Sequence, residues 1–236
     1  MPGKLYLIPT PLGLNGQHAL PDYMLEIVRG LDVFITERGK TARQFLKSVG
    51  LHKPLQSMTF FELNKRTSPD DLSSFIKPAI EDDKDIGLMS EAGCPGVADP
   101  GAVIVSLAHE AGIQVVPLVG PSSILLALMA SGINGQSFAF HGYLPQKPNE
   151  RKKALKEKEK HASKWKQTQL FIETPYRNNA FVEDALQTLR DETYFGIATD
   201  ITLASEYICS HTVRRWKKTK IPNLHKRPTI FMLLAR

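Results

Sequence analysis

The chain has 236 residues, of which 42% are hydrophobic and 23% are charged, and it carries a formal net charge of +6. This composition is typical of a globular protein with enough apolar material for one large domain or two domains of about 120 residues. The longest apolar helix expected, residues 124–130, is far shorter than the roughly 20 residues that a membrane span needs. The apolar stretch near the N-terminus is too short for a secretory signal, so we expect a cytoplasmic protein without membrane contact.

Cysteine content and charge distribution bear on metal binding and on contact with a polyanion. Cys94 and Cys209 are too few for a disulfide framework, and neither belongs to a cluster with metal-ligand spacing, so we expect no metal. Much of the positive charge lies in residues 151–166 and 214–227. Such blocks either attract a polyanion or form a solvated face, and charge alone does not separate the two interpretations.

The first half of the chain alternates short apolar runs with helical patterns. The expected strands are 5–9, 31–36, 86–90 and 113–118, and the expected helices are 20–30, 41–49, 71–81 and 102–111. Glycines at 30, 50 and 112 mark favoured helix ends. The alternation predicts a largely parallel sheet that is covered by helices on both faces.

The second half follows a Pro/Gly-rich link at 118–121. Its expected helices are 124–131, 149–166 and 178–190, and its expected extended segments are 138–142, 169–173, 194–199, 202–209 and 229–235. We therefore expect an α/β protein with an N-terminal α/β domain over residues 1–118 and a C-terminal α/β domain over residues 119–236.

Two common nucleotide-binding signatures are absent from the sequence. The GKT at 39–41 resembles the end of a P-loop, but Phe34 stands where that motif requires a glycine. No GxGxxG follows an expected strand, so the dinucleotide-binding fold has no support.

Three segments that follow expected strands carry unusual residues. PTPLG at 9–13 is stiffened by two prolines, and it is equally explained as a rigid turn. SEAGCPGVADPG at 90–101 combines three glycines, two prolines and two carboxylates, which favours a ligand-binding loop, although Asp99 can simply cap the next helix. GPSS at 120–123 precedes an apolar helix whose free N–H groups can bind a carboxylate, but capping alone explains both serines.

Together these three segments resemble the tetrapyrrole methylase superfamily, and within it the branch of the 16S ribosomal RNA cytidine 2′-O-methyltransferases (ribosomal RNA small subunit methyltransferase I). Further matches follow in order: Glu37 after the second strand, Asn64 in an aromatic–acidic–asparagine segment, FxGYLPxK…R at 140–151, and E-x-P-x-R at 173–177. The resemblance spans residues 4 to 210. It implies two α/β domains of the tetrapyrrole-methylase type with the cofactor cleft between them, S-adenosylmethionine as the cofactor, and a homodimer.

The sequence departs from that branch in two places. After Glu37 the branch continues with Asp-Thr-Arg, whereas this chain has RGK at 38–40. Where the branch has an E-L-T-K segment, this chain has DITL at 200–203 and lacks the lysine. Both departures lie outside the cofactor loops, so the resemblance supports methyl transfer better than it supports ribosomal RNA as the acceptor.

The resemblance implies which residues contact the cofactor. They are Pro9, Ser90, Glu91, Ala92, Gly93, Cys94, Asp99, Ser122, Ser123, Phe171, Ala198 and Thr229. The 90–101 segment suits a sulfonium cation, because it contains two carboxylates and neither lysine nor arginine. Ile172, beside Phe171, is also explained as a core residue.

Methyl transfer to a hydroxyl depends on alignment and gains from a base that accepts the proton. Glu37 and Glu173 are the acidic candidates for this base. Each is also explained as a structural carboxylate that pairs with Arg38, with Arg177 or with the backbone.

The candidate substrate contacts are Asn64, Arg177, Arg214, Arg215 and Lys217. RRWKK at 214–218 interleaves an aromatic ring with four cations, which suits stacking of a base and binding of phosphates; the alternative is a solubilising face with Trp216 packed inward. In the charged helix 149–166, Leu155 and Trp165 are the expected apolar anchors.

These observations predict a methyltransferase that acts on ribosomal RNA or the small ribosomal subunit, at a ribose 2′-oxygen. Two alternatives stay open: a small-molecule acceptor such as a tetrapyrrole, and a non-catalytic relative that binds RNA or cofactor.

Overall fold

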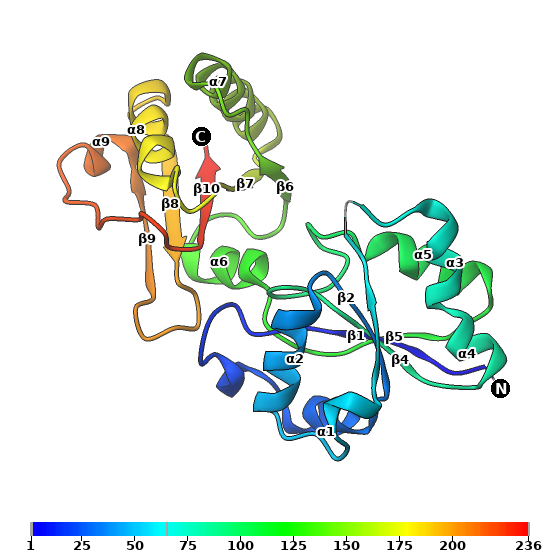
Figure 1. Ribbon diagram of the computed structural model, residues 1–236. Coiled ribbons are helices and arrows are strands. Elements are labelled where there is room, and N and C mark those ends of the chain that lie inside the picture. The colour runs from blue at the N-terminus through cyan, green and yellow to red at the C-terminus, as the bar shows by residue number, and fades with distance from the viewer. Residues whose placement is uncertain (1, 65, 236) are drawn as a thin grey trace. The chain divides into compact units, whose positions relative to one another are not determined.

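The structure is a computed structural model that describes residues 2–64 and 66–235. The chain divides into two compact units, Met1–Ser122 and Ser123–Arg236, each built around a five-stranded sheet (Figure 1). The division falls four residues beyond the boundary expected after residue 118. Across the described residues, no helix has both the length and the apolar character needed to cross a membrane.

The sheet of the first unit is parallel throughout, in the order β3-β2-β4-β1-β5. Its strands are β1 (Leu5–Ile8), β2 (Val33–Thr36), β3 (Thr59–Glu62), β4 (Ile86–Met89) and β5 (Val115–Pro117). Every residue of the central strands β2 and β4 is buried, which is typical of parallel strands covered on both faces. The edge strand β3 was not expected from the sequence; only half of its residues are even partly buried, so its apolar signal is weak.

Helices cover both faces of this sheet, as the alternating pattern predicts. They are α1 (Asp22–Gly30), α2 (Gly39–Ser48), α3 (Pro69–Phe75), α4 (Lys77–Glu81) and α5 (Ala102–Glu110), with short 3-10 turns at Gln17–Ala19 and Leu55–Ser57. One core joins Phe34 to Met24 and Leu46 of α1 and α2, and the other joins Ile35 to Ile104 of α5. Because neighbouring residues of β2 point to opposite faces, both cores are closed by the same strand.

The expected single helix 71–81 is wrong, because the structure has two helices there. α3 begins after Ser68, whose side chain accepts a hydrogen bond from the N–H of Asp70, and it ends at Phe75. Pro78 lies in the first turn of α4. Proline lacks the N–H that would continue the ladder and clashes with the preceding turn, so one straight helix cannot run through this position.

The sheet of the second unit is mixed, in the order β6-β7-β10-β8-β9. Its strands are β6 (Phe138–Tyr143), β7 (Thr168–Ile172), β8 (Tyr194–Thr199), β9 (Tyr207–Thr212) and β10 (Thr229–Leu234), and only β6 and β7 pair in parallel. Its helices are α6 (Ser123–Ser131), α7 (Pro148–Trp165), α8 (Asn178–Thr188) and α9 (Val213–Trp216). The expected segment 202–209 is shifted, because β9 begins five residues later, and α9 was not expected.

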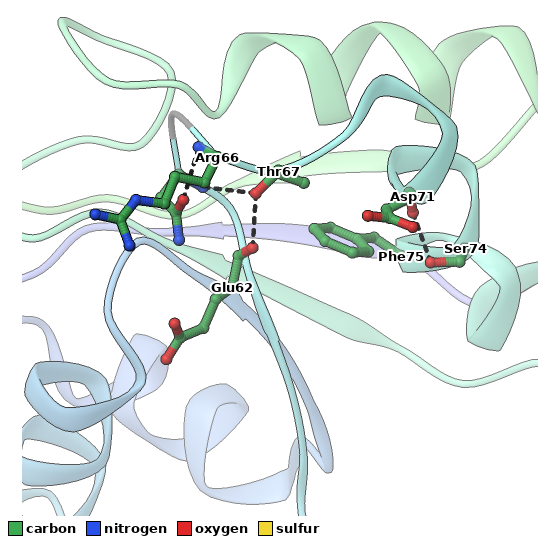
Figure 2. A pocket seen from close by; sticks show the side chains of 7 residues that line it. Glu62, Arg66, Thr67, Asp71, Ser74 and Phe75 are labelled. Carbon is green, nitrogen blue, oxygen red and sulfur yellow. Dashed lines mark hydrogen bonds between the residues drawn. The ribbon is translucent and has the colours of Figure 1, made fainter.

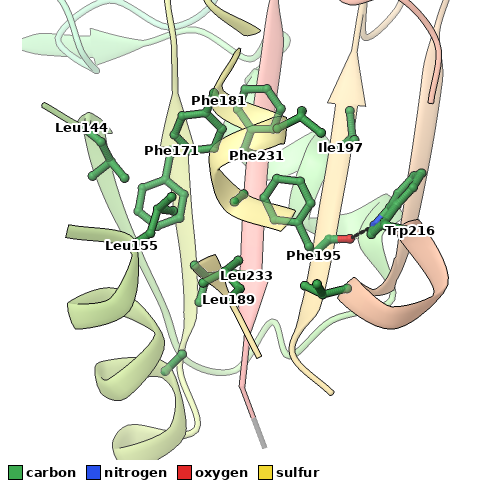
Figure 3. Close-up of a cluster of buried hydrophobic side chains, with 14 of the residues drawn as sticks. Leu144, Leu155, Phe171, Phe181, Leu189, Phe195, Ile197, Trp216, Phe231 and Leu233 are labelled. Atoms are coloured by element: carbon green, nitrogen blue, oxygen red, sulfur yellow. Dashed lines mark hydrogen bonds between the residues drawn. The ribbon is translucent and has the colours of Figure 1, made fainter. Parts of the chain in front are cut away.

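Aromatic rings fill the core beneath α7 and α8 (Figure 3). Phe231 of β10 stacks on Phe181 of α8 with ring centroids 4.5 Å apart. The ring centroid of Phe195 of β8 lies 5.9 Å from that of Phe231. Leu155 of α7 is fully buried in this core, as expected. Trp165 is not an anchor, since it is 62% exposed at the end of α7. The buried ion pair between Arg151 and Asp184 joins α7 to α8 instead.

Candidate functional site

The loops that follow β1 and β4 are hydrogen-bonded to each other in the first unit. The N–H of Thr10 donates to the carbonyl of Gly93, and the N–H of Gly93 donates to the carbonyl of Thr10, both at 3.0 Å. β1 and β4 are neighbouring parallel strands, so their carboxyl ends lie at the same edge of the sheet. Open parallel sheets bind ligands at this edge.

The loop after β5 reaches the same two loops. A Cβ placed on Gly120 would lie 2.4 Å from the Cβ of Pro9, so only glycine allows this approach. The thiol of Cys94 lies 3.6 Å from the carbonyl of Pro121. All three segments that stood out in the sequence therefore contact one another within the first unit.

Ser90 holds the 90–101 loop in shape. Its hydroxyl donates to the carbonyl of Gly93 at 2.6 Å, and its own carbonyl accepts a 3.2 Å hydrogen bond from the hydroxyl of Thr10. Ser90 is only 8% exposed, so it acts as a scaffold for the loop rather than as a surface for a ligand. Thr10 shares this role, since its hydroxyl and backbone bond to Ser90 and Gly93.

Asp99 closes the other end of the loop. Its Oδ1 accepts hydrogen bonds from the N–H groups of Gly96 at 2.6 Å and Gly101 at 2.8 Å. Gly96 has φ +77° and Ala98 has φ +61°, so the backbone between these bonds turns through the left-handed region. Asp99 therefore shapes the loop, as the capping interpretation expects, and it also leaves a half-buried carboxylate there.

The carboxylates of Asp99 and Glu91 act on that of Glu37 beside these loops. Burial raises the pKa of Glu37, and the charges of Asp99 and Glu91 raise it further, whereas a backbone hydrogen bond from Glu91 and the charge of Arg38 lower it. Burial also raises the pKa of Asp99, against the lowering by its two N–H donors. Burial and the charge of Asp99 raise the pKa of the Cys94 thiol, which keeps it protonated. The site therefore disfavours further negative charge and favours a cation.

The remaining cofactor candidates of the first unit lie on the same loops. Glu91 is half-buried and Ala92 is exposed, while Gly93 and Pro9 are buried. Ser122 is half-buried at the end of the unit. Ser123 is the first residue of α6 and belongs to the second unit.

A separate pocket of about 370 Å³ lies at the end of β3 in the first unit, and Figure 2 shows the side chains around it. Its lining includes Asn64, whose Oδ1 accepts a 2.9 Å hydrogen bond from the N–H of Arg66. Glu62 lines it too and accepts a 2.9 Å hydrogen bond from the N–H of Gly39, at the start of α2. The RGK segment, which departs from the related branch, is thus hydrogen-bonded to the lining of this pocket. Asn64 is the lining residue that the sequence pattern indicates.

In the second unit, Phe171 does not present its side chain to a ligand. It is fully buried between the ring of His141, 5.5 Å away, and the ring of Phe181, 6.2 Å away. The expectation that Phe171 covers a cofactor is therefore wrong for its side chain, because alternation along β7 turns it toward α7 and α8. Ile172, expected in the core, is the half-buried neighbour on the opposite face.

Ala198 lies on β8, two strands from Ile172, and Thr229 lies on β10 between these two strands. Ile230 pairs with both Ile172 and Ala198, which places these three residues in one row across the sheet. Ala198 is fully buried, and Thr229 is 6% exposed with its hydroxyl 2.9 Å from that of Thr199. Neither side chain is open to solvent.

Glu173 follows β7 and forms a structural ion pair. Its Oε1 accepts hydrogen bonds from the N–H of Thr174 at 2.6 Å and from the guanidinium of Arg177 at 2.6 and 3.0 Å. The structural interpretation therefore accounts for Glu173 and Arg177 better than proton transfer does. The other carboxylate oxygen, Oε2, is buried without a hydrogen-bond partner among the described residues. A buried acceptor without a donor is costly, so Oε2 suits a donor that comes from a ligand.

Two cations of the basic segment 214–218 have acidic partners. Trp216 is 1% exposed and donates from Nε1 to the carbonyl of Phe195 at 2.7 Å, so its ring is not available for stacking. Lys217 binds Asp191 at 2.7 Å, and Arg214 contacts both Asp191 and Glu192. Arg215 is exposed. Trp216 is therefore packed inward, as the alternative interpretation of this segment expects.

A second hollow, of about 530 Å³, lies along α7 and concentrates positive charge. Its lining includes Lys156, Lys160 and Lys164, which are spaced one turn apart, together with Arg190. Glu159 is the acidic residue of the lining, and it is already bonded to the N–H of Arg190 at 2.8 Å. None of these three lysines forms an ion pair with a residue that the structure describes.

Metal ligands do not gather at either sheet. Within the part of the chain that the structure describes, no group of three or more His, Cys, Asp and Glu side chains is arranged to hold a metal ion.

Comparison with known proteins places this arrangement in a family. The model of the tetrapyrrole (corrin/porphyrin) methylases matches residues 4–215. Ribosomal RNA small subunit methyltransferase I of Haemophilus influenzae is 32% identical over 92% of this chain and 72% of its own length, and that of Neisseria meningitidis serogroup B is 31% identical over 89% and 68%. The crystal structure of the methyltransferase CobJ has the same fold, with a TM-score of 0.64 at 15% identity over 99% of this chain and 94% of that one. The chain therefore belongs to the tetrapyrrole methylase family, as its loop motifs predict, and it is a methyltransferase.

Proposed function

We propose that this methyltransferase uses S-adenosylmethionine and methylates ribosomal RNA at a ribose 2′-oxygen. The observation that carries the proposal is the cluster of three mutually bonded loops at the carboxyl edge of the parallel sheet, with Glu37, Glu91 and Asp99 beside them. The acceptor is supported by the curated relatives, which are named as ribosomal RNA methyltransferases and match most of this chain.

The residues of the first unit fit this cofactor. S-adenosylmethionine supplies a methyl group bound to a positively charged sulfur, and its amino group is a second cation. The 90–101 loop offers carboxylates and no basic side chain, and the raised pKa values of its Asp99 and of the nearby Glu37 favour an incoming cation. Gly93, at φ +77°, lets a ligand approach the backbone closely.

The second unit offers a complementary feature. The unpartnered Oε2 of Glu173 can accept a hydrogen bond from a hydroxyl, such as that of a ribose. Thr229 lies on β10, which pairs with β7, and Ala198 lies on β8 beyond it, so we keep both as candidate cofactor contacts through their backbone rather than their buried side chains. Contact of one cofactor with residues of both units stays a prediction.

Glu37 is the better of the two candidate bases. Its carboxylate is half-buried and its pKa is raised, which brings it closer to the pH at which a carboxylate can accept the proton of a hydroxyl. Glu173 is held by a guanidinium on one oxygen and is buried on the other, so it orients a ligand rather than accepting its proton.

The remaining expectations also belong to this proposal. Asn64 and Arg177 stay candidate substrate contacts, while the ion pairs of Arg214 and Lys217 assign them a weaker role than the charged segment predicts. A homodimer and a cytoplasmic location stay predictions. A small-molecule acceptor is not favoured by any feature of the described residues.

The test is transfer of labelled methyl groups from S-adenosylmethionine to small ribosomal subunits of a strain that lacks the protein. We expect label in the RNA, in linkages that resist alkaline cleavage, because a methylated 2′-oxygen can no longer attack the adjacent phosphate. Glu37→Gln should abolish most of the transfer while retaining cofactor affinity in calorimetry. Label that appears only in small molecules would refute the RNA acceptor, and absence of cofactor binding at millimolar concentration would refute the cofactor.

A further inference from the structure

An exposed aromatic side chain stands on a rigid loop of the second unit. Tyr176 follows β7 in the loop that leads into α8, and it is 70% exposed. Exposed aromatic rings usually belong to mobile surface segments or to binding sites, and only the latter need a fixed backbone. The question is whether the backbone at Tyr176 is fixed.

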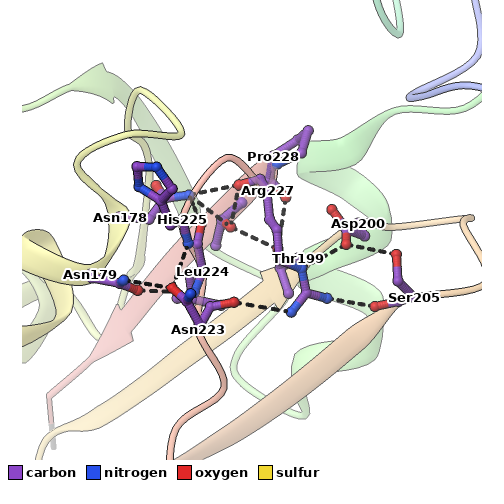
Figure 4. A network of polar contacts seen from close by, with 11 residues as sticks. Asn178, Asn179, Thr199, Asp200, Ser205, Asn223, Leu224, His225, Arg227 and Pro228 are labelled. Atoms are coloured by element: carbon purple, nitrogen blue, oxygen red, sulfur yellow. Dashed lines mark hydrogen bonds and ion pairs between the residues drawn. The ribbon is translucent and has the colours of Figure 1, made fainter.

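The loop before β10 is hydrogen-bonded to Asn178 and Asn179 at the start of α8 (Figure 4). The amide of Asn178 donates to the carbonyls of Leu224 at 3.2 Å and Arg227 at 2.6 Å. Asn179 accepts the N–H of Leu224 at 2.9 Å and donates to Asn223 at 2.7 Å. The side chain of Leu224 is fully buried in the core. The two loops therefore form one hydrogen-bonded body.

The same attachment places a cation and a second ring at Tyr176. The N–H of Lys226 donates to the carbonyl of Pro175 at 3.0 Å, and Lys226 adopts φ +62°, a conformation that few non-glycine residues take. Its Nζ lies 5.9 Å from the centre of the Tyr176 ring. The ring of His225 meets that of Tyr176 edge-on, with centroids 5.6 Å apart and an angle of 72°.

We propose that Tyr176, His225 and Lys226, here called the Tyr176 platform, bind an unpaired base of the RNA substrate by stacking. A fixed, exposed ring flanked by a cation matches what single-stranded RNA offers, which is a flat base beside a phosphate. An apolar protein partner is less suited, because His225 and Lys226 are exposed and polar. The proposal rests on the proposed function in one respect, namely that RNA is the substrate.

The platform takes over the role that the sequence suggested for the RRWKK segment. Trp216 is buried and hydrogen-bonded, whereas Tyr176 keeps its ring in solvent. The loop anchored by Asn178 and Asn179 supplies the order that stacking requires, so less conformational entropy is lost when a base binds.

The experiment measures binding of a short single-stranded RNA, and of the same RNA with abasic sites, to the full chain without methyl donor. Tyr176→Ala should weaken binding of the intact RNA by roughly 5- to 150-fold, the range that stacking of one base supplies. It should leave the affinity for abasic RNA and the salt dependence unchanged. Tyr176→Phe should retain wild-type binding, because the ring alone stacks.

Two further variants define the site. Tyr143→Ala removes another exposed ring of the second unit, 60% exposed on β6, and should not change binding. Lys226→Gln should lower the slope of log affinity against log salt by about 0.7, the value for one phosphate contact on a single strand.

Several results would overturn the platform: unchanged RNA binding by Tyr176→Ala, equal loss in Tyr143→Ala, or loss of S-adenosylmethionine affinity with RNA affinity intact. The last result would mean that the ring holds the adenine of the methyl donor. Failure of the proposed function is separable, because RNA binding that depends on Tyr176 without any methyl transfer would refute the function and leave the platform. Absence of RNA binding by the wild-type chain would refute both.

Discussion

Replacement of Gly93 by alanine tests whether the loop after β4 holds the methyl donor. Gly93 has φ +77°, and both its N–H and its carbonyl bond to Thr10. A Cβ at this position would lie 3.3 Å from Cδ2 of Leu12 and 3.5 Å from the carbonyl of Pro121. These contacts are tight but not prohibitive, because the end of the Leu12 side chain can move by a few tenths of an ångström.

The stability cost follows from the backbone conformation. An L-residue in the left-handed region costs about 1–2 kcal/mol, and this cost should lower the melting temperature by roughly 2–8 °C in a chain of this length. Since domains are stable by about 5–15 kcal/mol, the variant should remain folded. Gly50→Ala is the matched control, because Gly50 has φ +73° and its Cβ would meet nothing within 4 Å.

Calorimetry with S-adenosylmethionine separates the two effects. Both variants should lose similar stability in denaturant unfolding, but only Gly93→Ala should lose donor affinity, by about tenfold or more, which is at least about 1.4 kcal/mol. Gly93 differs from Gly50 in its contacts with the two other loops, so the difference reports on the site. Wild-type donor affinity in Gly93→Ala would show that this loop merely connects β4 to α5.

Two other predictions concern charge. Because the pKa of Glu37 is raised, the folded chain retains its proton above the ordinary value of 4.5, so the stability contribution of this group falls as pH rises from that value through the raised pKa. Glu37→Gln should therefore increase the free energy of unfolding at neutral pH. It should also lower kcat by roughly 10²- to 10⁴-fold and remove the acidic limb of the pH–rate profile. An unchanged limb would exclude Glu37 as the base. Charge reversal along α7, in Lys156→Glu, Lys160→Glu and Lys164→Glu, should lower the salt dependence of RNA binding more than reversal at Arg214, which already has acidic partners. Equal slopes would show that the lysines of α7 do not contact RNA phosphates.

The sequence predicted the helices and strands whose buried residues form a clear apolar pattern. The strands β2 and β4 read as continuous apolar runs because both of their faces are covered. The strand β3 lies at the sheet edge and has exposed residues at both of its ends, Thr59 and Glu62, so its composition resembles that of a loop. Its pairing with β2 comes from tertiary contacts, which a local pattern does not contain.

The two tryptophans show the same limit for single residues. Trp165 ends a charged helix, so the pattern places it inside, whereas the pattern leaves Trp216 either stacked on a base or packed inward. In the structure Trp165 is exposed and Trp216 is buried. Trp216 is buried because the carbonyl of Phe195 satisfies its N–H, and that acceptor is 21 residues away in sequence.

At the site, the residues of the recognisable motif shape the loop rather than contact a ligand with their side chains. Ser90 and Asp99 belong to the most recognisable motif, yet their side chains are engaged in hydrogen bonds that shape the loop. The neighbouring order of β4, β1 and β5 explains why the three loops meet, since parallel strands bring their carboxyl ends to one edge. A motif therefore identifies the residues that the backbone geometry requires, and it is specific because few sequences can adopt that geometry.

Residues that contact a ligand need not belong to such a motif. Glu37 acquires its raised pKa from burial and then from carboxylates that lie more than fifty positions away in the sequence, and Tyr176 acquires its fixed position from asparagines that bond to another loop. Neither property is visible in the residues that flank them. Variation of acceptor within this fold should therefore arise at positions such as Tyr176 and the RGK segment, which lie outside the hydrogen bonds between the loops after β1 and β4.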